Sequence, residues 1–218
     1  MKRLLILLAA CLTACAGQND GLLLQSLNFP EQTDNSFVTI EPKQPMALKA
    51  FTLCMKILSE ARDTVSVFSY ATSTHHNQLL LGLGSDNLRL HLAEEQVEFR
   101  IRRPLVGWMP ICVTWDSQTG NTRVWVNGSR TVTKICSKGK DVVAGGVVIL
   151  GQDQDQVGGG FSKKQSFMGE VTDLNLWNLV RRDTEMPTCS RLERGNVIDW
   201  TNVKYQITGR VLVQGPDE

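Results

Sequence analysis

The sequence predicts an all-β fold, an antiparallel two-sheet sandwich with one short helix. The stretch Ile111–Gly128 has the pattern of two alternating strands joined by a polar turn, which is typical of a β-hairpin. Short strand-like runs bounded by turn residues recur along the rest of the chain, and one segment alone carries helix-end signals. The sequence contains no internal repeat or interdomain linker, so we expect one domain behind a short leader.

The leader has the layout of a cleaved secretory signal peptide. A basic start precedes an apolar run from Leu4 to Leu12 and small residues up to Ala16, and this run is too short to cross a bilayer as a helix. We therefore expect residues 1–16 to be a signal peptide and residues 17–218 to be a secreted domain with no membrane span. One alternative stays open, because the residues that end at Cys15 also fit a bacterial lipoprotein box.

The charge balance gives no indication of a polyanionic partner. Loss of the leader removes two of the 23 basic residues and leaves 21 against 22 acidic residues, a net charge of −1 with neutral histidines. Nothing in this balance indicates a surface for nucleic acid or anionic membranes. About 200 residues can bury an ordinary all-β core without further staples.

Alternation of apolar and polar residues begins in residues 35–40 and 46–58, which a proline-containing turn separates. The second run puts Cys54 on one face and four apolar residues on the other, namely Phe51, Leu53, Met55 and Ile57. Residues 64–70 form a further predicted strand. A polar loop, residues 72–78, follows it and contains His75, His76 and Asn77.

The middle of the chain continues the same pattern. Alternation in residues 88–92 and 97–102 predicts strands with one wet face, and His91 lies on such a face without an expected role. In the hairpin, Asn127-Gly128 favours a type I′ turn into a third strand from Arg130. A short apolar strand, residues 147–150, then runs into a long loop that ends at Gln165.

The predicted helix lies near the C-terminal end. Asp183 or Thr184 is a suitable cap, Pro187 is tolerated in the first turn, and Gly195 is a stop signal. The tryptophans at positions 115, 125, 177 and 200 are expected to serve packing.

The long loop contains the densest group of oxygen donors. Gln152-Asp153-Gln154-Asp155 places two carboxylates beside amide and carbonyl oxygens, and such donors suit a hard cation such as calcium. A solvated acidic turn is the competing interpretation. His75 and His76 would suit zinc or copper, but no third ligand stands at a suitable spacing, so we interpret them as part of a solvated loop.

Two kinds of covalent modification are indicated. Asn127-Gly128-Ser129 is a glycosylation sequon on the predicted hairpin turn. Removal of the leader leaves four of the six cysteines, at positions 54, 112, 136 and 189. Four cysteines allow three pairings in an oxidising compartment, and spacing alone does not choose among them.

The order Cys112, Thr114, Trp115, Ser117, spaced as Cys-x-Thr-Trp-x-Ser, resembles the signature box of the pentraxin family, with Pro110 where the box usually has histidine. The resemblance extends over about residues 27–213. Four further segments resemble pentraxin segments in the same order, namely residues 68–72, 150–155, 171–177 and 196–205. The resemblance implies a lectin-like jelly roll, a Cys54–Cys112 disulfide, and a ring of identical subunits with five as the expected number.

The resemblance also implies a calcium site in the long loop. Its metal ligands would be Asn77, Asp153, the main-chain carbonyl of Gln154, Asp155 and Gln165. Two departures weaken it, because His76 and Ser162 each replace a carboxylate and two lysines follow Ser162. We therefore expect fewer or weaker calcium ions than the full family site holds.

Three functions compete. The first is a secreted pattern-recognition protein of innate immunity that binds carbohydrate or phosphate-bearing ligands through a calcium-linked face. The family's phosphocholine positions fall on Gly82 and Gln96, which leaves that one ligand without its usual contacts. The second is a pentraxin-like interaction protein with weak or absent calcium dependence. A glycosidase is the third, and we expect no enzyme, because no catalytic carboxylate pair or activated nucleophile is recognisable.

Overall fold

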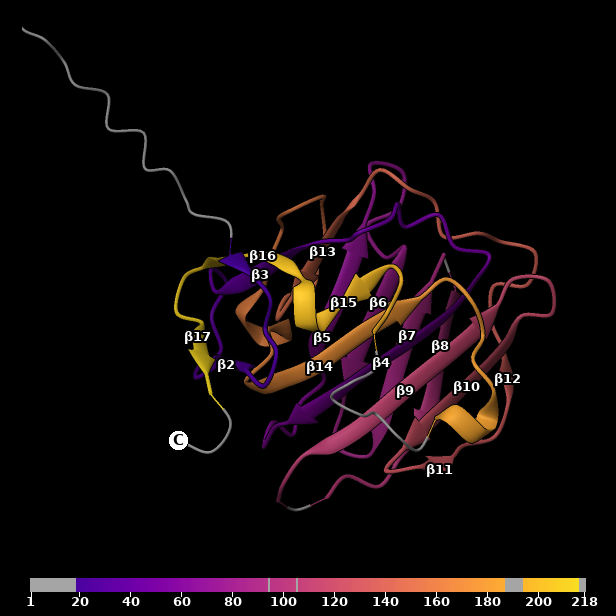
Figure 1. The fold of residues 1–218 in the computed structure, drawn as a ribbon, viewed down its shortest axis with the longest axis horizontal. Helices are drawn as coiled ribbons and strands as arrows, with labels where there is room; N and C mark the ends of the chain where they lie inside the picture. Colours follow the sequence, from indigo (N-terminus) through magenta and orange to yellow (C-terminus); the bar gives the residue numbers. More distant parts are fainter. Residues whose placement is uncertain (1–18, 94, 105, 187–193, 216–218) are drawn as a thin grey trace, which may run out of the picture.

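The computed structural model describes residues 19–93, 95–104, 106–186 and 194–215, and these form two antiparallel β-sheets that pack face to face (Figure 1). The prediction of an all-β two-sheet sandwich is confirmed. In the described parts of the chain, no helix is long and apolar enough to span a membrane.

The first sheet has eight strands, and the outermost are β1 and β8. In spatial order they are β1 (Asn19–Asp20), β16 (Lys204–Thr208), β3 (Phe37–Glu41), β13 (Val147–Leu150), β5 (Val65–Ala71), β6 (Leu79–Leu83), β7 (Asn87–Leu92) and β8 (Glu95–Arg100).

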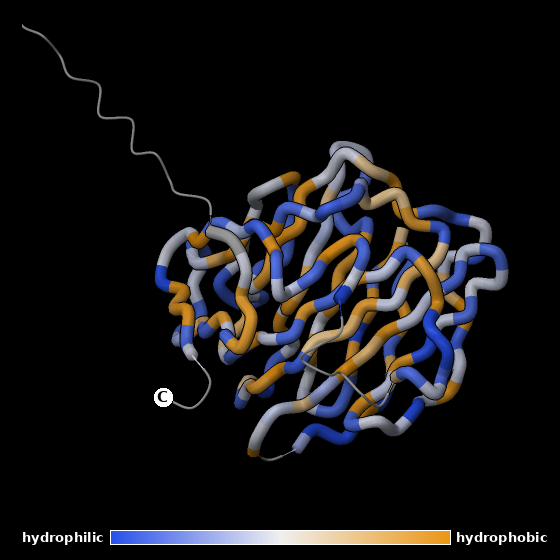
Figure 2. The backbone as a smooth tube through the Cα atoms, viewed as in Figure 1, coloured by the Kyte–Doolittle hydropathy of each residue, from blue (hydrophilic) through white to orange (hydrophobic). Residues whose placement is uncertain are grey.

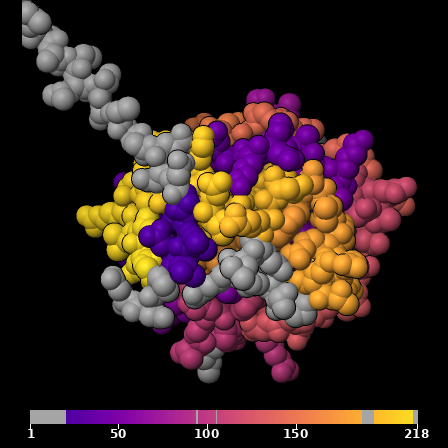
Figure 3. Space-filling model, viewed as in Figure 1, coloured from indigo at the N-terminus to yellow at the C-terminus, as the bar shows by residue number. Residues whose placement is uncertain are grey.

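The second sheet has nine strands and ends at β11 and β17. Its main order is β11 (Ser129–Arg130), β10 (Asn121–Val126), β9 (Met109–Asp116), β4 (Ala50–Leu58), β14 (Gly169–Trp177), β2 (Ser26–Phe29) and β17 (Leu212–Gln214), with β12 (Lys134–Ile135) on β10 and β15 (Ile198–Asp199) on β14. Because β17 pairs with β2, C-terminal and N-terminal residues share one side of the molecule (Figure 3).

The hairpin around which the prediction was built is present as β9 and β10. Trp115 lies opposite Thr122, and Cys112 lies opposite Trp125. Asn127 and Gly128 both have positive φ, at 49° and 75°, as a type I′ turn requires. The third strand, β11, is only two residues long.

The core lies between the sheets and follows from the period of two along each strand. In β4 the predicted apolar face is buried in it, and Cys54 lies on the opposite face. Figure 2 shows hydrophobic and hydrophilic residues alternating along much of the chain. Trp115 and Trp200 are fully buried in the same core. The outer face of β4 is buried as well, because the segment that follows β14 crosses it.

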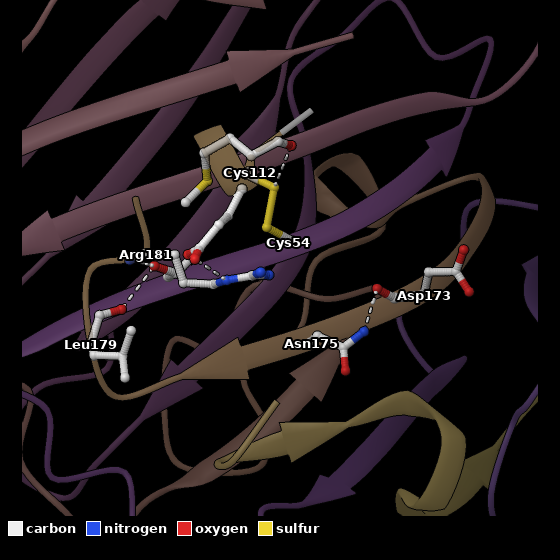
Figure 4. Close-up of a disulfide and its surroundings, with 9 residues drawn as sticks. Cys54, Cys112, Asp173, Asn175, Leu179 and Arg181 are labelled. Atoms are coloured by element: carbon white, nitrogen blue, oxygen red, sulfur yellow. Dashed lines mark hydrogen bonds and ion pairs between the residues drawn. A yellow bond between two sulfur atoms is a disulfide. The ribbon is translucent and has the colours of Figure 1, made fainter. Parts of the chain in front are cut away.

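That outer cluster contains the disulfide. Cys54 and Cys112 face each other in the β4–β9 register and are bonded, so the predicted pairing is confirmed (Figure 4). Trp125, Trp177 and Met186 pack around the bridge. The guanidinium of Arg181 stacks 4.5 Å from the centre of the Trp177 ring, and this contact pins the crossing segment to the sheet.

Cys136 is free and buried, so a link to another subunit would require the core to open. Cys189 lies outside the described residues. Burial raises the pKa of the Cys136 thiol above its ordinary value, which keeps the thiol protonated and unreactive.

The predicted helix is described only at its start. Asp183–Glu185 forms a 3-10 turn, η2, and the Glu185 carboxylate accepts a hydrogen bond from the backbone N–H of Arg182 at 3.1 Å. Most of the remaining predicted helix lies outside the described residues. Two further 3-10 turns, η1 (Lys163–Gln165) and η3 (Trp200–Asn202), complete the described helical structure.

Two central strands were absent from the periodic segments. β6 is buried on both faces, so its sequence LLLGL does not alternate. In β14 a bulge interrupts the register between Thr172 and Asn175, and Asp173 within it has a φ of 55°. The buried Asp173 carboxylate pairs with Lys56 at 2.7 Å, which explains a polar residue inside a core strand.

Candidate metal and ligand site

The long loop after β13 folds back over the outer face of β5. Gly151 makes the turn possible, because its φ is +90° and an added Cβ would lie 2.3 Å from a Phe29 ring carbon. Two backbone bonds hold the turn. Gly151 N–H donates to the carbonyl of Val67 at 3.1 Å, and Phe167 N–H donates to the carbonyl of Gly151 at 2.9 Å.

The side chain of Gln154 anchors the loop from inside. Its amide nitrogen donates to the carbonyl of Val147 and to the hydroxyl of Ser69, both at 3.0 Å, and its oxygen accepts from Gly158 N–H at 2.8 Å. Because this side chain is fully buried and bonded, only the main-chain carbonyl of Gln154 is left to face an ion. That is the group the resemblance assigned to calcium.

Asp153 and Asp155 alternate with the anchored glutamines, so their side chains leave the chain on the other side. Asp153 is buried and Asp155 is exposed. The turn η1 brings Gln165 back to them, and its amide donates to Asp153 Oδ2 at 3.0 Å. Three of the predicted metal ligands therefore lie next to one another.

Burial and a second carboxylate both act on the ionisation of Asp153. Burial, and then repulsion by Asp155, raise its pKa from 3.8 to about 6, whereas the nearby His76 and the Gln154 N–H act in the opposite direction. A buried acid of this kind favours either a proton or a cation at its oxygens.

Asn77 lies in the loop between β5 and β6, next to His76, which interacts electrostatically with Asp153. That loop is closed by a hydrogen bond from Thr72 N–H to the carbonyl of His75 at 2.9 Å. Asn77 Oδ1 and Asp153 Oδ1 are both buried, and neither has a hydrogen-bond partner among the described residues. Buried oxygens without partners are rare in folded proteins, and a bound cation would satisfy both.

The donor set fits calcium better than a transition metal. It consists of carboxylate, amide and carbonyl oxygens, which are hard ligands. Among the described residues no three His, Cys, Asp or Glu side chains are arranged to hold one metal ion. Ser162 precedes η1, and Lys163 and Lys164 are exposed within it, so positive charge stands near the site.

A pocket of about 280 Å³ adjoins Asn77. Its lining contains every histidine of the chain, and the residues are Thr74, His75, His76, Asn77, His91 and Glu95. His91 and Glu95 had no role in the sequence-based prediction. Their positions on β7 and β8 were the only signal, and it takes the strand order β6-β7-β8 to show that they border the loop. Burial lowers the pKa of His91, so its imidazole favours the neutral form.

The two positions expected to contact phosphocholine do not supply that contact. Gly82 is buried in β6 opposite Arg89, and Gln96 is exposed on β8 opposite His91. Neither residue provides an aromatic ring or an acid. Asn127 stands exposed on its turn, as a glycosylated asparagine must.

Comparisons with known proteins agree with this fold. The model of the Pentaxin family matches residues 25–215. A pentraxin fusion protein from Xenopus laevis is 37% identical over 207 residues, which are 92% of this chain and 49% of that protein. C-reactive protein from Danio rerio is 33% identical over 218 residues and covers 96% of each chain. The crystal structure of a native heptameric SAP-like pentraxin from Limulus polyphemus has a TM-score of 0.80 and 29% identity, over 90% of this chain and 97% of that one.

Proposed function

The chain belongs to the pentraxin family, and from this premise we propose that it is a secreted pattern-recognition protein of innate immunity that binds carbohydrate or phosphate-bearing surfaces through a calcium-linked face. One observation carries the proposal. Two buried oxygens, Asn77 Oδ1 and Asp153 Oδ1, lack partners among the described residues. They lie in two different loops, and His76, next to Asn77 in the first loop, interacts electrostatically with Asp153 in the second. A calcium ion would complete both, and the Gln154 carbonyl, Asp155 and Gln165 would add further oxygens.

We expect one weakly held ion for each subunit. Two adjacent calcium ions repel each other, so a pair needs dense carboxylate charge, and this loop offers only Asp153 and Asp155. His76 is a poor ligand for a hard cation, and Ser162 carries no charge. Lys163 and Lys164 further disfavour a second ion.

The histidine-lined pocket beside Asn77 is the proposed place for the ligand's polar groups. Imidazoles and the Thr74 hydroxyl can hydrogen-bond sugar hydroxyls or phosphate oxygens, while a calcium ion next to Asn77 would attract the same oxygens. Because Gly82 and Gln96 offer no aromatic wall or acid, a choline cation gains little here. We therefore expect sugars or phosphate groups to bind in preference to phosphocholine.

The experiment is binding to immobilised sugars, phosphoethanolamine and phosphocholine, with calcium and with a chelator. The proposal predicts binding that needs calcium and weakens when the pocket residue His91 is changed to Ala. Binding that survives the chelator would favour the second candidate, a pentraxin-like interaction protein without calcium dependence. The observation that supports this candidate is that His76 and Ser162 stand where the family pattern has carboxylates.

Restoring the missing carboxylates should strengthen calcium binding. His76→Asp with Ser162→Glu adds two hard ligands beside Asp153, and we expect the affinity to rise by about tenfold or more. Calorimetric titration measures the affinity and the number of ions. The control Gln44→Glu with Thr133→Glu adds the same charge at distant exposed positions. An equal gain in the control would mean that net charge, and not ligation, is responsible, and two tight ions in the unmodified protein would contradict the proposal of one weak ion.

The edges of the second sheet support the proposal of an oligomer. Leu212 and Val213 of β17 are 51% and 38% exposed, and Ile135 of β12 is 60% exposed at the opposite edge (Figure 1). Apolar edge strands on opposite sides favour a head-to-tail contact, which closes into a ring when the rotation allows it. We propose such a homo-oligomer, with a pentamer as the expectation.

Leu212→Lys is expected to convert the oligomer to monomers, because it places an unpaired charge in an apolar contact. Sedimentation velocity at micromolar concentration measures the oligomeric state of the variant and of the parent protein. Val143→Lys changes a similarly exposed valine in a loop and should leave the oligomer intact. A monomeric unmodified protein, with and without calcium, would refute the assembly.

A further inference from the structure

The outer face of β7, which lies between β6 and β8 in the first sheet, carries two polar residues at the histidine pocket (Figure 1). The leucines at positions 88, 90 and 92 are buried in the core, so the alternation of the strand puts Arg89 and His91 outside. His91 lines the pocket, and Arg89 follows about 7 Å farther along the strand. Burial, and then the positive charge of Arg89, lower the pKa of His91. A ligand that fills the pocket and extends along β7 therefore meets Arg89.

The guanidinium of Arg89 has bonding capacity to spare. Its Nε donates to Glu98 Oε1 at 2.9 Å, and Gln96 Nε2 donates to the same oxygen at 3.0 Å. Among the described residues the Arg89 side chain has no other hydrogen-bond partner, so the N–H groups of its two terminal nitrogens are left. The side chains of Arg89 and Glu98 are 33% and 42% exposed, and a surface pair of this kind contributes little to stability. Glu98 thus orients the guanidinium and leaves free the end that can bind a carboxylate through two parallel bonds.

Gly82 on β6 lies opposite Arg89, and the backbone does not require glycine there. Gly82 has no positive φ, and an added Cβ would meet nothing nearer than Thr64 Cγ2 at 3.5 Å, with Arg89 Cβ at 3.7 Å. The neighbouring bulge lies in β5, on the other strand, so it does not explain the glycine either. Glycine inside a strand costs stability and often marks a place of close ligand approach. A side chain at this position would stand between Thr64 and Arg89, and its absence leaves room beside the arginine.

The charges along this face suit a ligand group with a single negative charge. Burial favours the neutral form of His91, and Glu95 Oε2 already accepts the N–H of Ser137 at 2.6 Å. Among the described residues of the pocket and of its extension along β7, Arg89 is the only permanent cation, and Glu98 stands beside it. A phosphate with two negative charges would exceed the positive charge available. A carboxylate has one charge and two oxygens in a plane, which match the two terminal nitrogens of a guanidinium.

We propose that Arg89 forms a subsite for a carboxylate, so that the preferred ligand of the calcium-linked face is an acidic sugar. The hydroxyl groups of the sugar lie in the histidine pocket, and its carboxylate accepts two parallel hydrogen bonds from the terminal nitrogens of Arg89. Glu98 is a positioning residue, because its bond to Nε fixes the direction of the guanidinium. This inference rests on the proposed function, since the pocket and the calcium ion hold the rest of the sugar.

The probes are immobilised β-linked glucuronic acid and β-linked glucose, which differ only in the carboxylate at C6. With calcium, glucuronic acid should bind about tenfold more tightly than glucose. Arg89→Gln should bring the two affinities to within about twofold of each other by weakening glucuronic acid alone. Arg62→Gln removes an exposed arginine elsewhere and should keep the preference. In the calcium-free protein, NMR titration should show that Arg89→Gln raises the pKa of His91, and an unchanged pKa would place Arg89 away from the pocket and overturn the proposal.

Gly82→Val tests the room beside Arg89 and removes no charge. Valine suits a strand, and its Cβ meets no close contact, so denaturant unfolding should find the variant at least as stable as the parent. Its binding of glucuronic acid should fall by about fivefold or more, because the new side chain fills the space that the carboxylate needs. A folded variant that keeps the preference would overturn the proposal. Arg89→Gln changes a partly exposed residue, so it remains decisive if Gly82→Val fails to fold.

The remaining outcomes separate this inference from the proposed function. Equal calcium-dependent binding of glucuronic acid and glucose would overturn the carboxylate subsite and leave the proposed function intact. A preference for glucuronic acid that persists in Arg89→Gln would put the carboxylate on the calcium ion and would also overturn the subsite. Tighter binding of immobilised glucose 6-phosphate than of glucuronic acid, lost in Arg89→Gln, would assign Arg89 to phosphate esters instead. If no sugar and no phosphate ester binds with calcium, the proposed function fails, and this inference fails with it.

Discussion

Replacement of both bridged cysteines, Cys54→Ala with Cys112→Ala, is expected to lower the free energy of unfolding by about 4 kcal/mol. The two residues are 58 positions apart and form neighbours on β4 and β9. Without the bridge, the unfolded chain regains the freedom that this large loop had lost. The alanines also remove two buried sulfurs from the cluster around Trp125 and Trp177, so packing losses add to the entropic loss.

Denaturant unfolding of the double variant and of the parent protein measures this effect. Cys136→Ala is the matched control, because Cys136 is equally buried but unbridged, and its loss should reflect packing alone, at about 1 kcal/mol. Any loss of ligand binding should be indirect, because the bridge joins two strands of the second sheet and the candidate loop follows β13 of the first sheet. A double variant that unfolds within about 1 kcal/mol of the parent would contradict the prediction.

The fold was predictable where one strand face is buried and the other is wet. Residues 111–128 alternate, carry a turn whose two central residues accept positive φ, and form the hairpin as expected. The disulfide pairing was predictable only through the family resemblance. Spacing could not choose among the cysteines, because their contact depends on β4 and β9 being neighbours in the sheet.

The strands that the sequence pattern did not predict lack this alternation of buried and wet positions. β6 is buried on both faces and β14 contains a bulge, so neither has the period of two that identifies a strand. In β14, Asp173 is compatible with the core only because Lys56 on the adjacent strand neutralises it, and that partner is more than a hundred residues away. Long-range pairing of this kind leaves no local signal in the sequence.

The candidate site was predictable in part. The resemblance supplied Asn77, Asp153, Asp155 and Gln165, and the structure places the last three of these side by side in the long loop. It could not supply His91 and Glu95, which lie on strands and face the pocket only because β7 and β8 follow β6 in the first sheet. Nor did the resemblance show that the Gln154 side chain would be hydrogen-bonded to Ser69 and Val147.

Asp153→Asn is expected to stabilise the calcium-free protein at pH 7.5 by up to about 3 kcal/mol and to abolish calcium binding. The folded-state pKa of Asp153 is raised, from 3.8 to about 6, chiefly by burial. Folding therefore retains a proton that the unfolded chain releases, and this group makes the protein less stable as pH rises from about 4 to about 6. Asparagine keeps the shape and the acceptor for Gln165, but it carries no charge to desolvate.

Thermal or denaturant unfolding with and without calcium, at pH 4.5 and pH 7.5, tests this reasoning. The difference between Asp153→Asn and the parent should be large at pH 7.5 without calcium and should shrink at pH 4.5, where Asp153 is protonated in the folded state. Calcium should reverse the order, because it stabilises only the parent by binding the folded form. The control Asp34→Asn removes an exposed carboxylate, so it should neither stabilise the calcium-free protein nor change the stabilisation by calcium. Calcium that stabilises Asp153→Asn as much as the parent would remove Asp153 from the site. A variant less stable than the parent at pH 7.5 without calcium would mean that the buried carboxylate has a partner other than calcium, since only compensation already present in the folded protein makes the charge favourable there.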